Sequence, residues 1–261
     1  MRASRRLLCS SVDKSRSFAL SGCGWLTPFH LGVVQRMKEE GFLTPNSIIG
    51  GTSGGSLAAA IACTDISPEV ALDYLIEMSQ SKAFRNNLHD EIKTSLRKFL
   101  PENSLEKCNG RLHVCVTKLW PQPRREVTII NQFDSVDKLL DVIAASCFIP
   151  LYSAPRVYAK VDHELFVDGG VFAFIPPVGE VRVSPIPLAS FIRSRRSHVH
   201  IISRKFSLPQ LISHVLIPAP PETLRELFHE GQRSADHWVR KEQTKRHLSL
   251  FVEEPLNQKI R

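Results

Sequence analysis

A serine inside a cluster of glycines is the first residue of this chain whose surroundings suit nucleophilic chemistry. Ser53 is the centre of Gly51-Thr52-Ser53-Gly54-Gly55, which follows the apolar pair Ile48-Ile49 and precedes a run of small helix-forming residues. This order predicts a strand, a tight turn and a helix, and the pentapeptide has the G-x-S-x-G pattern of a nucleophile elbow. In such a turn the N–H groups after the serine begin a helix and can stabilise an oxyanion. An ordinary glycine-rich turn is the alternative, because short glycine and serine patterns recur by chance.

A second glycine loop, Gly22-Cys23-Gly24, follows the expected strand 17–21. Glycines directly after a strand expose backbone N–H groups, which can bind an anion or supply oxyanion donors. The start of a dinucleotide-binding loop is the alternative. The third glycine of that motif is missing at the required spacing, and no acidic residue ends the next strand.

A carboxylate ends a later expected strand. Asp168-Gly169-Gly170 follows residues 164–167, and the two glycines allow a tight turn that can approach another loop closely. The alternative is an Asp-Gly turn without chemical function.

The elements around the two glycine loops form a βαβ unit. Strand 17–21 is followed by a helix that we expect to begin with Thr27 as N-cap and Pro28 in the first turn and to end at Gly41, before the strand at Ile48-Ile49. Such a unit implies a parallel sheet, and ligand sites of open parallel sheets lie at the carboxyl ends of the strands. Both glycine loops are therefore expected at one edge.

Hydrophobic periodicity predicts further helices and strands downstream of the elbow. The expected helices start at Ser67-Pro68-Glu69, run through Leu88, Ile92, Leu96 and Phe99, follow the cap Asp134-Ser135, and start at Pro220-Pro221-Glu222. The expected strands cover residues 112–117, 127–130, 164–167, 181–183 and 199–202. We expect a buried side with Val70, Tyr74, Leu75 and Met78 on the first of these helices and with Leu224, Leu227, Phe228 and Trp238 on the last.

Length and composition indicate one globular domain. The chain has 261 residues, of which 43% are hydrophobic and 23% charged, and no uncharged apolar run long enough for a transmembrane helix. We expect a basic leader over residues 1–16, a single α/β domain over 17–240, and a charged, frayed tail over 241–261. The leader lacks the apolar core of a secretory signal, so it is either a disordered segment or a short organelle transit segment.

The charge suits an anionic partner, and the cysteines suit a reducing compartment. The net charge of +8 fits anionic lipid headgroups or nucleic acid, but the basic patches lack the aromatic interleaving of single-strand binders. The six cysteines have no Cys-x-x-Cys and no Cys/His metal spacing, so we expect reduced, mostly buried thiols, no metal and no cofactor.

Taken together, the three sites resemble the patatin-like phospholipase family, and more closely its adiponutrin and adipose triglyceride lipase branch. Gly22-Cys23-Gly24-Trp25-Leu26 is similar to that branch's oxyanion loop, and Phe29-His30-Leu31-Gly32 to its first helix. Gly51 to Gly55 is similar to its nucleophile elbow, and Asp168-Gly169-Gly170 to the motif of its catalytic aspartate; Ser146-Cys147-Phe148-Ile149-Pro150 is similar to the segment before that aspartate strand. The resemblance implies a three-layer α/β/α fold with a mainly parallel central sheet.

The resemblance also implies a reaction without a histidine. Asp168 would deprotonate Ser53, which attacks a fatty-acyl ester of a phospholipid or acylglycerol and forms an acyl-enzyme. The N–H groups of Gly22, Cys23, Gly24 and Gly54 would stabilise the oxyanion. The expected partner is a lipid substrate at a membrane or lipid-droplet surface, reached by peripheral contact, with no nucleic acid, and the expected location is intracellular.

Two alternatives remain open. The usual Ser-His-Asp triad would need a histidine, and His163 lies near Asp168 in sequence while His198 and His200 follow it. The family loop usually has a glycine near Thr27-Pro28 and often a basic residue that Trp25-Leu26 does not supply. Because proline has no N–H, part of the oxyanion hole could differ, and a lipid-binding or regulatory protein on the same fold is the second hypothesis.

Overall fold

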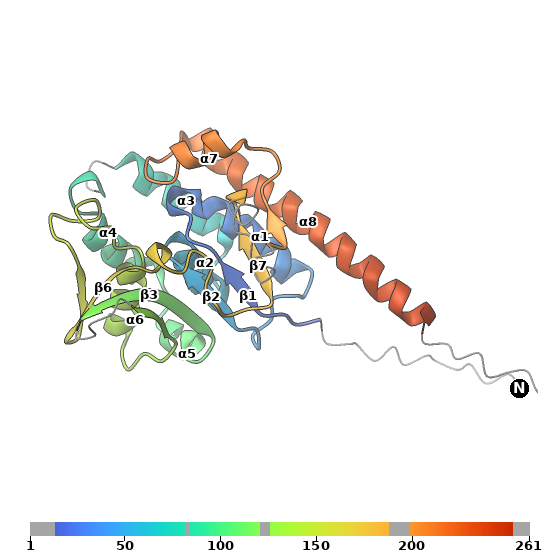
Figure 1. Cartoon of the computed structure of the whole chain (residues 1–261), viewed down its shortest axis with the longest axis horizontal. Coiled ribbons are helices and arrows are strands. Elements are labelled where there is room, and N and C mark those ends of the chain that lie inside the picture. The colour runs from blue at the N-terminus through green and yellow to red at the C-terminus, as the bar shows by residue number, and fades with distance from the viewer. Residues whose placement is uncertain (1–13, 82–83, 121–125, 188–198, 253–261) are drawn as a thin grey trace, which may run out of the picture.

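The computed structural model describes residues 14–81, 84–120, 126–187 and 199–252, and its centre is a mixed, mostly parallel sheet flanked by helices (Figure 1). The strands are β1 (Phe18–Leu20), β2 (Ile49–Thr52), β3 (Leu112–Trp120), β4 (Glu126–Ile130), β5 (Ala159–Val161), β6 (Glu164–Asp168), β7 (Val181–Ser184) and β8 (Ile201–Ile202). Hydrogen-bonded neighbours follow the path β5-β6-β3-β2-β1-β7-β8, with β4 paired to β3 beside this path. The predicted three-layer α/β/α class with a mainly parallel sheet is confirmed.

Strand β3 joins a parallel half of the sheet to an antiparallel half. β2 runs parallel to the first residues of β3, whereas β4 and β6 run antiparallel to it. β4 pairs with residues 114–118 of β3 and so overlaps the stretches that pair with β2 and with β6. A strand has only two edges, so β2 and β6 must share the edge opposite β4.

This shared edge brings the ends of β2 and β6 together. Thr52, the last residue of β2, pairs with Cys115, and Asp168, the last residue of β6, pairs with Val116. The two strands approach from opposite directions and end at consecutive residues of β3. Ser53 and Asp168 therefore meet although 115 residues separate them.

The helices begin and end largely where caps and glycines predict. They are η1 (Gly24–Leu26), α1 (Thr27–Glu39), α2 (Gly54–Cys63), α3 (Pro68–Gln80), α4 (Phe84–Phe99), α5 (Ser104–Cys108), α6 (Val136–Ser146), η2 (Gly169–Val171), α7 (Leu208–Ser213) and α8 (Pro221–Val252). Ser67 and Ser135 cap α3 and α6, accepting hydrogen bonds from Glu69 N–H and Lys138 N–H.

Several expectations about these elements are wrong. Thr27 is the first residue of α1 rather than its N-cap, which is Leu26, because the short helix η1 already turns the chain. Val70 is 53% exposed, and the buried stripe of α3 lies one position further, at Ala71, Leu75 and neighbouring residues. Sequence analysis also missed the short elements α5, α7 and β5, whose few residues carry little periodic pattern.

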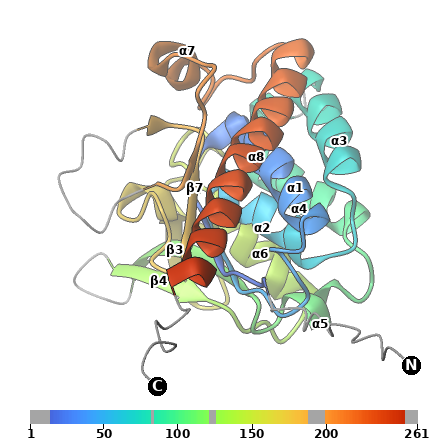
Figure 2. The same cartoon turned by 90° about the vertical axis from the view of Figure 1, so that its right-hand side faces the viewer.

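Helix α8 packs along α1 through a pair of glycines, as the side-by-side helices in Figure 2 show. A Cβ on Gly32 would lie 2.0 Å from the carbonyl oxygen of Phe228, and a Cβ on Gly231 would lie 2.1 Å from that of Phe29. Only residues without a side chain allow this approach. The expected fraying after Arg240 is wrong, because the helix continues to Val252; the boundaries 1–16, 17–240 and 241–261 stay predictions.

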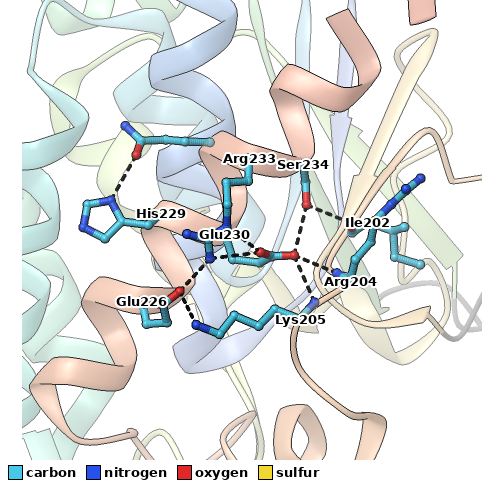
Figure 3. A network of polar contacts seen from close by, with 9 residues as sticks. Ile202, Arg204, Lys205, Glu226, His229, Glu230, Arg233 and Ser234 are labelled. Atoms are coloured by element: carbon cyan, nitrogen blue, oxygen red, sulfur yellow. Dashed lines mark hydrogen bonds and ion pairs between the residues drawn. The ribbon is translucent and has the colours of Figure 1, made fainter. Parts of the chain in front are cut away.

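The buried carboxylate of Glu230 links α8 by hydrogen bonds to the residues that follow β8 (Figure 3). Glu230 accepts hydrogen bonds from the N–H groups of Arg204 at 2.7 Å and Lys205 at 3.1 Å. Ser234, one turn later, donates to the carbonyl of Ile202 at 2.9 Å. These contacts fix the start of the segment that leads through α7 to residues 214–220, which lie over the candidate site.

Candidate active site

Ser53 occupies a strained turn between β2 and α2. Its φ of 52° and ψ of −130° are unusual for a residue with a side chain, and the neighbouring glycines allow the turn. A Cβ on Gly51 would lie 2.5 Å from the carbonyl oxygen of Gly55, and a Cβ on Gly55 would lie 2.4 Å from that of Leu20. The glycines of the pentapeptide are thus required by close backbone approach.

Buried hydroxyls hold this turn in place. The Ser53 N–H donates to Ser146 Oγ at 2.9 Å, and Ser146 Oγ donates in turn to the carbonyl of Cys115 at 2.7 Å. Ser56 Oγ donates to the carbonyl of Ser53 at 2.6 Å. The sequence gives no sign of these supporting roles, because isolated serines carry no signal of long-range contact.

Asp168 accepts a hydrogen bond from the Ser53 hydroxyl. The distance from Ser53 Oγ to Asp168 Oδ2 is 2.6 Å, while Oδ1 accepts from the Gly170 N–H at 2.7 Å. Thr117 Oγ1 donates to the main-chain carbonyl of Asp168 at 3.0 Å. The aspartate is only 6% exposed, and this burial raises the pKa of its carboxyl to about 6, with the two hydrogen bonds opposing the rise.

The two glycine loops meet beside this pair. A Cβ on Gly54 would lie 2.7 Å from the carbonyl oxygen of Gly24 and 2.8 Å from Cys23 Sγ. Gly24 and Gly54 are the first residues of η1 and α2, so their N–H groups have no partner within their own helices. The Gly22 N–H, however, donates to the carbonyl of Phe174 at 2.7 Å. The Gly22 N–H therefore already has a hydrogen-bond acceptor in this structure. The N–H groups of Cys23, Gly24 and Gly54 remain as the expected oxyanion donors.

Thr27 and Pro28 do not interrupt the expected oxyanion loop. Both belong to the first turn of α1, where the missing N–H of proline leaves no intrahelical bond unmade. Thr27 Oγ1 donates to the carbonyl of Gly24 at 2.8 Å and so braces the loop. This position argues against the loss of an oxyanion donor at Pro28.

The thiols around the serine are neutral. Burial raises the pKa of Cys23 to about 12 and also raises the pKa of Cys147. A thiolate is the nucleophilic form of cysteine, so neither side chain competes with Ser53. The five cysteines among the described residues are all buried and outside any disulfide, as predicted, and Cys9 lies outside the described residues.

The two described histidines weighed for a triad, His163 and His200, make no hydrogen bond to the Asp168 carboxylate that the structure shows. His163 is exposed between β5 and β6, and His200 is exposed and accepts from the Arg182 N–H through Nδ1; His198 lies outside the described residues. His30 is buried, with Nε2 3.0 Å from the carbonyl oxygen of Ser21, and burial lowers its pKa to about 4. The hydrogen bonds to the Asp168 carboxylate come from Ser53 and Gly170.

An apolar pocket opens onto the Ser53 hydroxyl. Its lining comes from residues 24–27, the helices α2 to α4, residues 147–152 and the segment 214–220. That segment is held over the oxyanion loop: the Trp25 N–H donates to the carbonyl of Val215 at 3.0 Å, and Trp25 Nε1 donates to Tyr152 Oη at 3.2 Å. Tyr152 in turn donates to the carbonyl of Leu216.

Two further features bear on the class of site. Within the described ranges, no group of three or more His, Cys, Asp or Glu side chains is arranged to hold a metal ion. None of the helices formed by the described residues combines the length and apolar character needed to span a bilayer.

Fold and geometry together define an α/β protein with a serine at a strained strand-to-helix turn, hydrogen-bonded to a buried aspartate beside the first N–H groups of two helices. The family model described as patatin-like phospholipase matches residues 18–178, which is more than half of the chain. The chain therefore belongs to the patatin-like phospholipase family, as its motifs predicted.

The relatives are named for a phospholipase-like domain and for acyl transfer. "Patatin-like phospholipase domain-containing protein 2" of Mus musculus is 30% identical over 86% of this chain and 50% of its own length. "1-acylglycerol-3-phosphate O-acyltransferase Pnpla3" of Mus musculus is 26% identical over 85% of this chain and 59% of its own length. "Omega-hydroxyceramide transacylase" of Homo sapiens is 26% identical over 88% of this chain and 46% of its own length. The chain spans about half the length of the curated relatives it matches.

Proposed function

We propose that this protein hydrolyses fatty-acyl esters of phospholipids or acylglycerols through a Ser53/Asp168 dyad. The observation that carries the proposal is the 2.6 Å hydrogen bond from Ser53 Oγ to Asp168 Oδ2. A carboxylate this close can accept the hydroxyl proton as the oxygen attacks. Membership of a family of patatin-like phospholipases and acyltransferases supports the same class of chemistry.

The proposed reaction has two halves. Ser53 Oγ attacks the ester carbonyl while Asp168 takes its proton, and the tetrahedral intermediate expels the alcohol, which leaves with that proton. Asp168 then removes a proton from water, the resulting hydroxide attacks the acyl-serine, and the fatty acid leaves as Ser53 regains its proton. We propose that the N–H groups of Cys23, Gly24 and Gly54 stabilise both oxyanions, because Gly54 lies against Cys23 and Gly24 beside Ser53.

The molecule that accepts the acyl group from Ser53 in the second half of the reaction decides between hydrolysis and acyl transfer. Water gives a free fatty acid, whereas an alcohol that reaches the acyl-serine first gives a new ester. Two of the relatives are named for acyl transfer. Analysis of products from a phospholipid or diacylglycerol, with and without added glycerol, separates the two outcomes.

We also propose peripheral docking on a lipid surface. Apolar side chains project around the open cavity outside the Ser53 pocket: Leu151 is 75% exposed and Ile217 is 68% exposed. Leu151 has a φ of 62°, so a left-handed turn presents its side chain to solvent. Together with the net charge of +8, these side chains suit a membrane or lipid-droplet surface with anionic headgroups.

The test is hydrolysis of p-nitrophenyl butyrate by the purified protein, with Ser53→Ala and the control Ser184→Ala. Ser184 is also buried, and its Oγ donates within its own turn to the carbonyl of Ile186 at 2.9 Å. We expect Ser53→Ala to abolish turnover and labelling by a fluorophosphonate probe, while Ser184→Ala retains both. Equal rates for the wild type and Ser53→Ala would exclude the dyad. Binding to vesicles without turnover would instead support the lipid-binding, regulatory alternative.

A further inference from the structure

Two apolar pockets of this protein share part of their walls, and Ser53 lines one of them. The pocket at Ser53 and the second pocket have five lining residues in common. The shared residues are Thr27, Leu57, Leu75, Met78 and Ile92. Because the two pockets share these side chains, they are neighbours, and we name the two together the acyl channel.

The acyl channel follows helix α2 away from the serine. Leu57 and Ile61 are spaced four residues apart in α2, so they lie on one face of this helix, which begins directly after Ser53. The helix from Gly54 to Ile61 spans ~10 Å. The opposite walls come from α3 and α4, which supply Leu75 and Ile92.

The lining of the acyl channel selects a hydrocarbon. None of the described residues that line the two pockets carries a charge. The hydroxyl of Ser95 donates to Met78 Sδ at 3.7 Å, so this polar group is already paired with the wall. A linear alkyl chain loses no hydrogen bonds on entering such a cavity, whereas a polar acyl group would.

Two stacked aromatic rings line the part of the acyl channel that Ser53 does not line. Tyr74 of α3 and Phe99 of α4 line only the second pocket, and their ring centroids are 5.3 Å apart with an angle of 19° between the planes. Both side chains are half-buried, so they separate the channel from solvent. Ala71, one turn before Leu75, lines the same end with a small side chain.

We infer that the Tyr74–Phe99 pair is the end wall of the acyl channel and sets the length of the linear fatty-acyl chain that the protein accepts on Ser53. This inference rests on the proposed function, which it deepens by naming the acyl specificity. Chains that reach the wall gain burial with each methylene, and longer chains must displace the rings. Each methylene left outside the channel lowers kcat/KM by about fourfold relative to a buried one.

The first experiment measures kcat/KM for p-nitrophenyl esters from acetate to palmitate. We expect Phe99→Ala, and more weakly Phe99→Leu, to shift the optimum to longer chains by opening the end wall. Ala71→Met should shift the optimum to shorter chains, because the methionine side chain fills the same part of the channel. The control Tyr158→Ala removes a tyrosine that is 39% exposed and lines neither pocket; it should leave the profile unchanged. An identical chain-length profile in all these variants would overturn the inference.

A second experiment separates the acyl channel from the catalytic proposal. In Ser53→Ala protein, saturated fatty acids of increasing length compete with a fluorescent fatty acid, and the same variants are made in this background. Length-dependent displacement that Phe99→Ala moves to longer chains supports the channel even if the wild type hydrolyses no ester. The inference is overturned if displacement does not depend on chain length, or if neither Phe99→Ala nor Ala71→Met changes the preferred chain length. Thermal unfolding of each variant confirms that the folded protein is being measured.

Discussion

Replacing Asp168 by asparagine should make the protein more stable and less active at the same time. Burial raises the pKa of the Asp168 carboxyl to about 6, compared with 3.8 for the free side chain. The folded protein therefore keeps a proton that the unfolded chain releases between these two values. Stability falls as the pH rises through this window, because the unfolded state then binds fewer protons than the folded state.

The size of this effect follows from the two pKa values. A difference of about 2 pKa units corresponds to ~3 kcal/mol at 1.36 kcal/mol per unit. This penalty is absent below pH 3.8, where both states are protonated, and complete above about pH 6. A neutral asparagine side chain carries no such penalty, and its carbonyl oxygen can still accept from the Gly170 N–H. Asp168→Asn should thus stabilise the protein by up to ~3 kcal/mol at pH 8 and have little effect near pH 4.

Denaturation and kinetics over pH 4 to 8 test both halves of this prediction. Urea unfolding should give a stability difference that grows between pH 4 and 6 and then stays constant. Wild-type kcat/KM should fall about tenfold for each pH unit below 6, because only the carboxylate can act as base, and Asp168→Asn should lose about 10² to 10⁴ in rate. A stability difference that does not change with pH, or a rate independent of pH between 5 and 7, would refute the assigned role of burial.

Two other predictions concern docking and packing. The double variant Leu151→Asn/Ile217→Ser should bind phosphatidylglycerol vesicles at least tenfold more weakly in a sedimentation assay. Its hydrolysis of p-nitrophenyl butyrate should be unchanged, because asparagine tolerates the left-handed turn at position 151. The control Val70→Ser, which also replaces an exposed aliphatic residue, should bind like the wild type, and equal binding by the wild type, the double variant and the control would contradict docking through Leu151 and Ile217. Gly32→Ala places a Cβ 2.0 Å from the Phe228 carbonyl oxygen, so α1 and α8 must separate, and the free energy of unfolding should fall by ~1–3 kcal/mol. An unchanged urea midpoint would show that the helices can move apart freely.

Local signals predicted much of the fold. Ser67 and Ser135 start helices because their side chains accept from the first free N–H groups, and that requirement is readable in the sequence. The buried stripe of α3 was misplaced because Val70 is as apolar as its neighbours, and periodicity alone does not distinguish faces that differ by one position. Helix α8 continues beyond Arg240, where we expected it to end, because the polar residues that follow are good helix formers and no stop signal interrupts them.

The sequence by itself determined which residues could do chemistry, because the backbone demands of the elbow and the Asp-Gly-Gly turn are local and leave glycines at fixed positions. Tertiary structure alone decided how they meet. Ser53 and Asp168 are neighbours because β2 and β6 end against the same edge of β3. The pKa of Asp168, the occupied N–H of Gly22 and the acyl channel likewise depend on residues distant in sequence. Burial and long-range pairing leave no local pattern, so the sequence identifies the candidate nucleophile but not its environment.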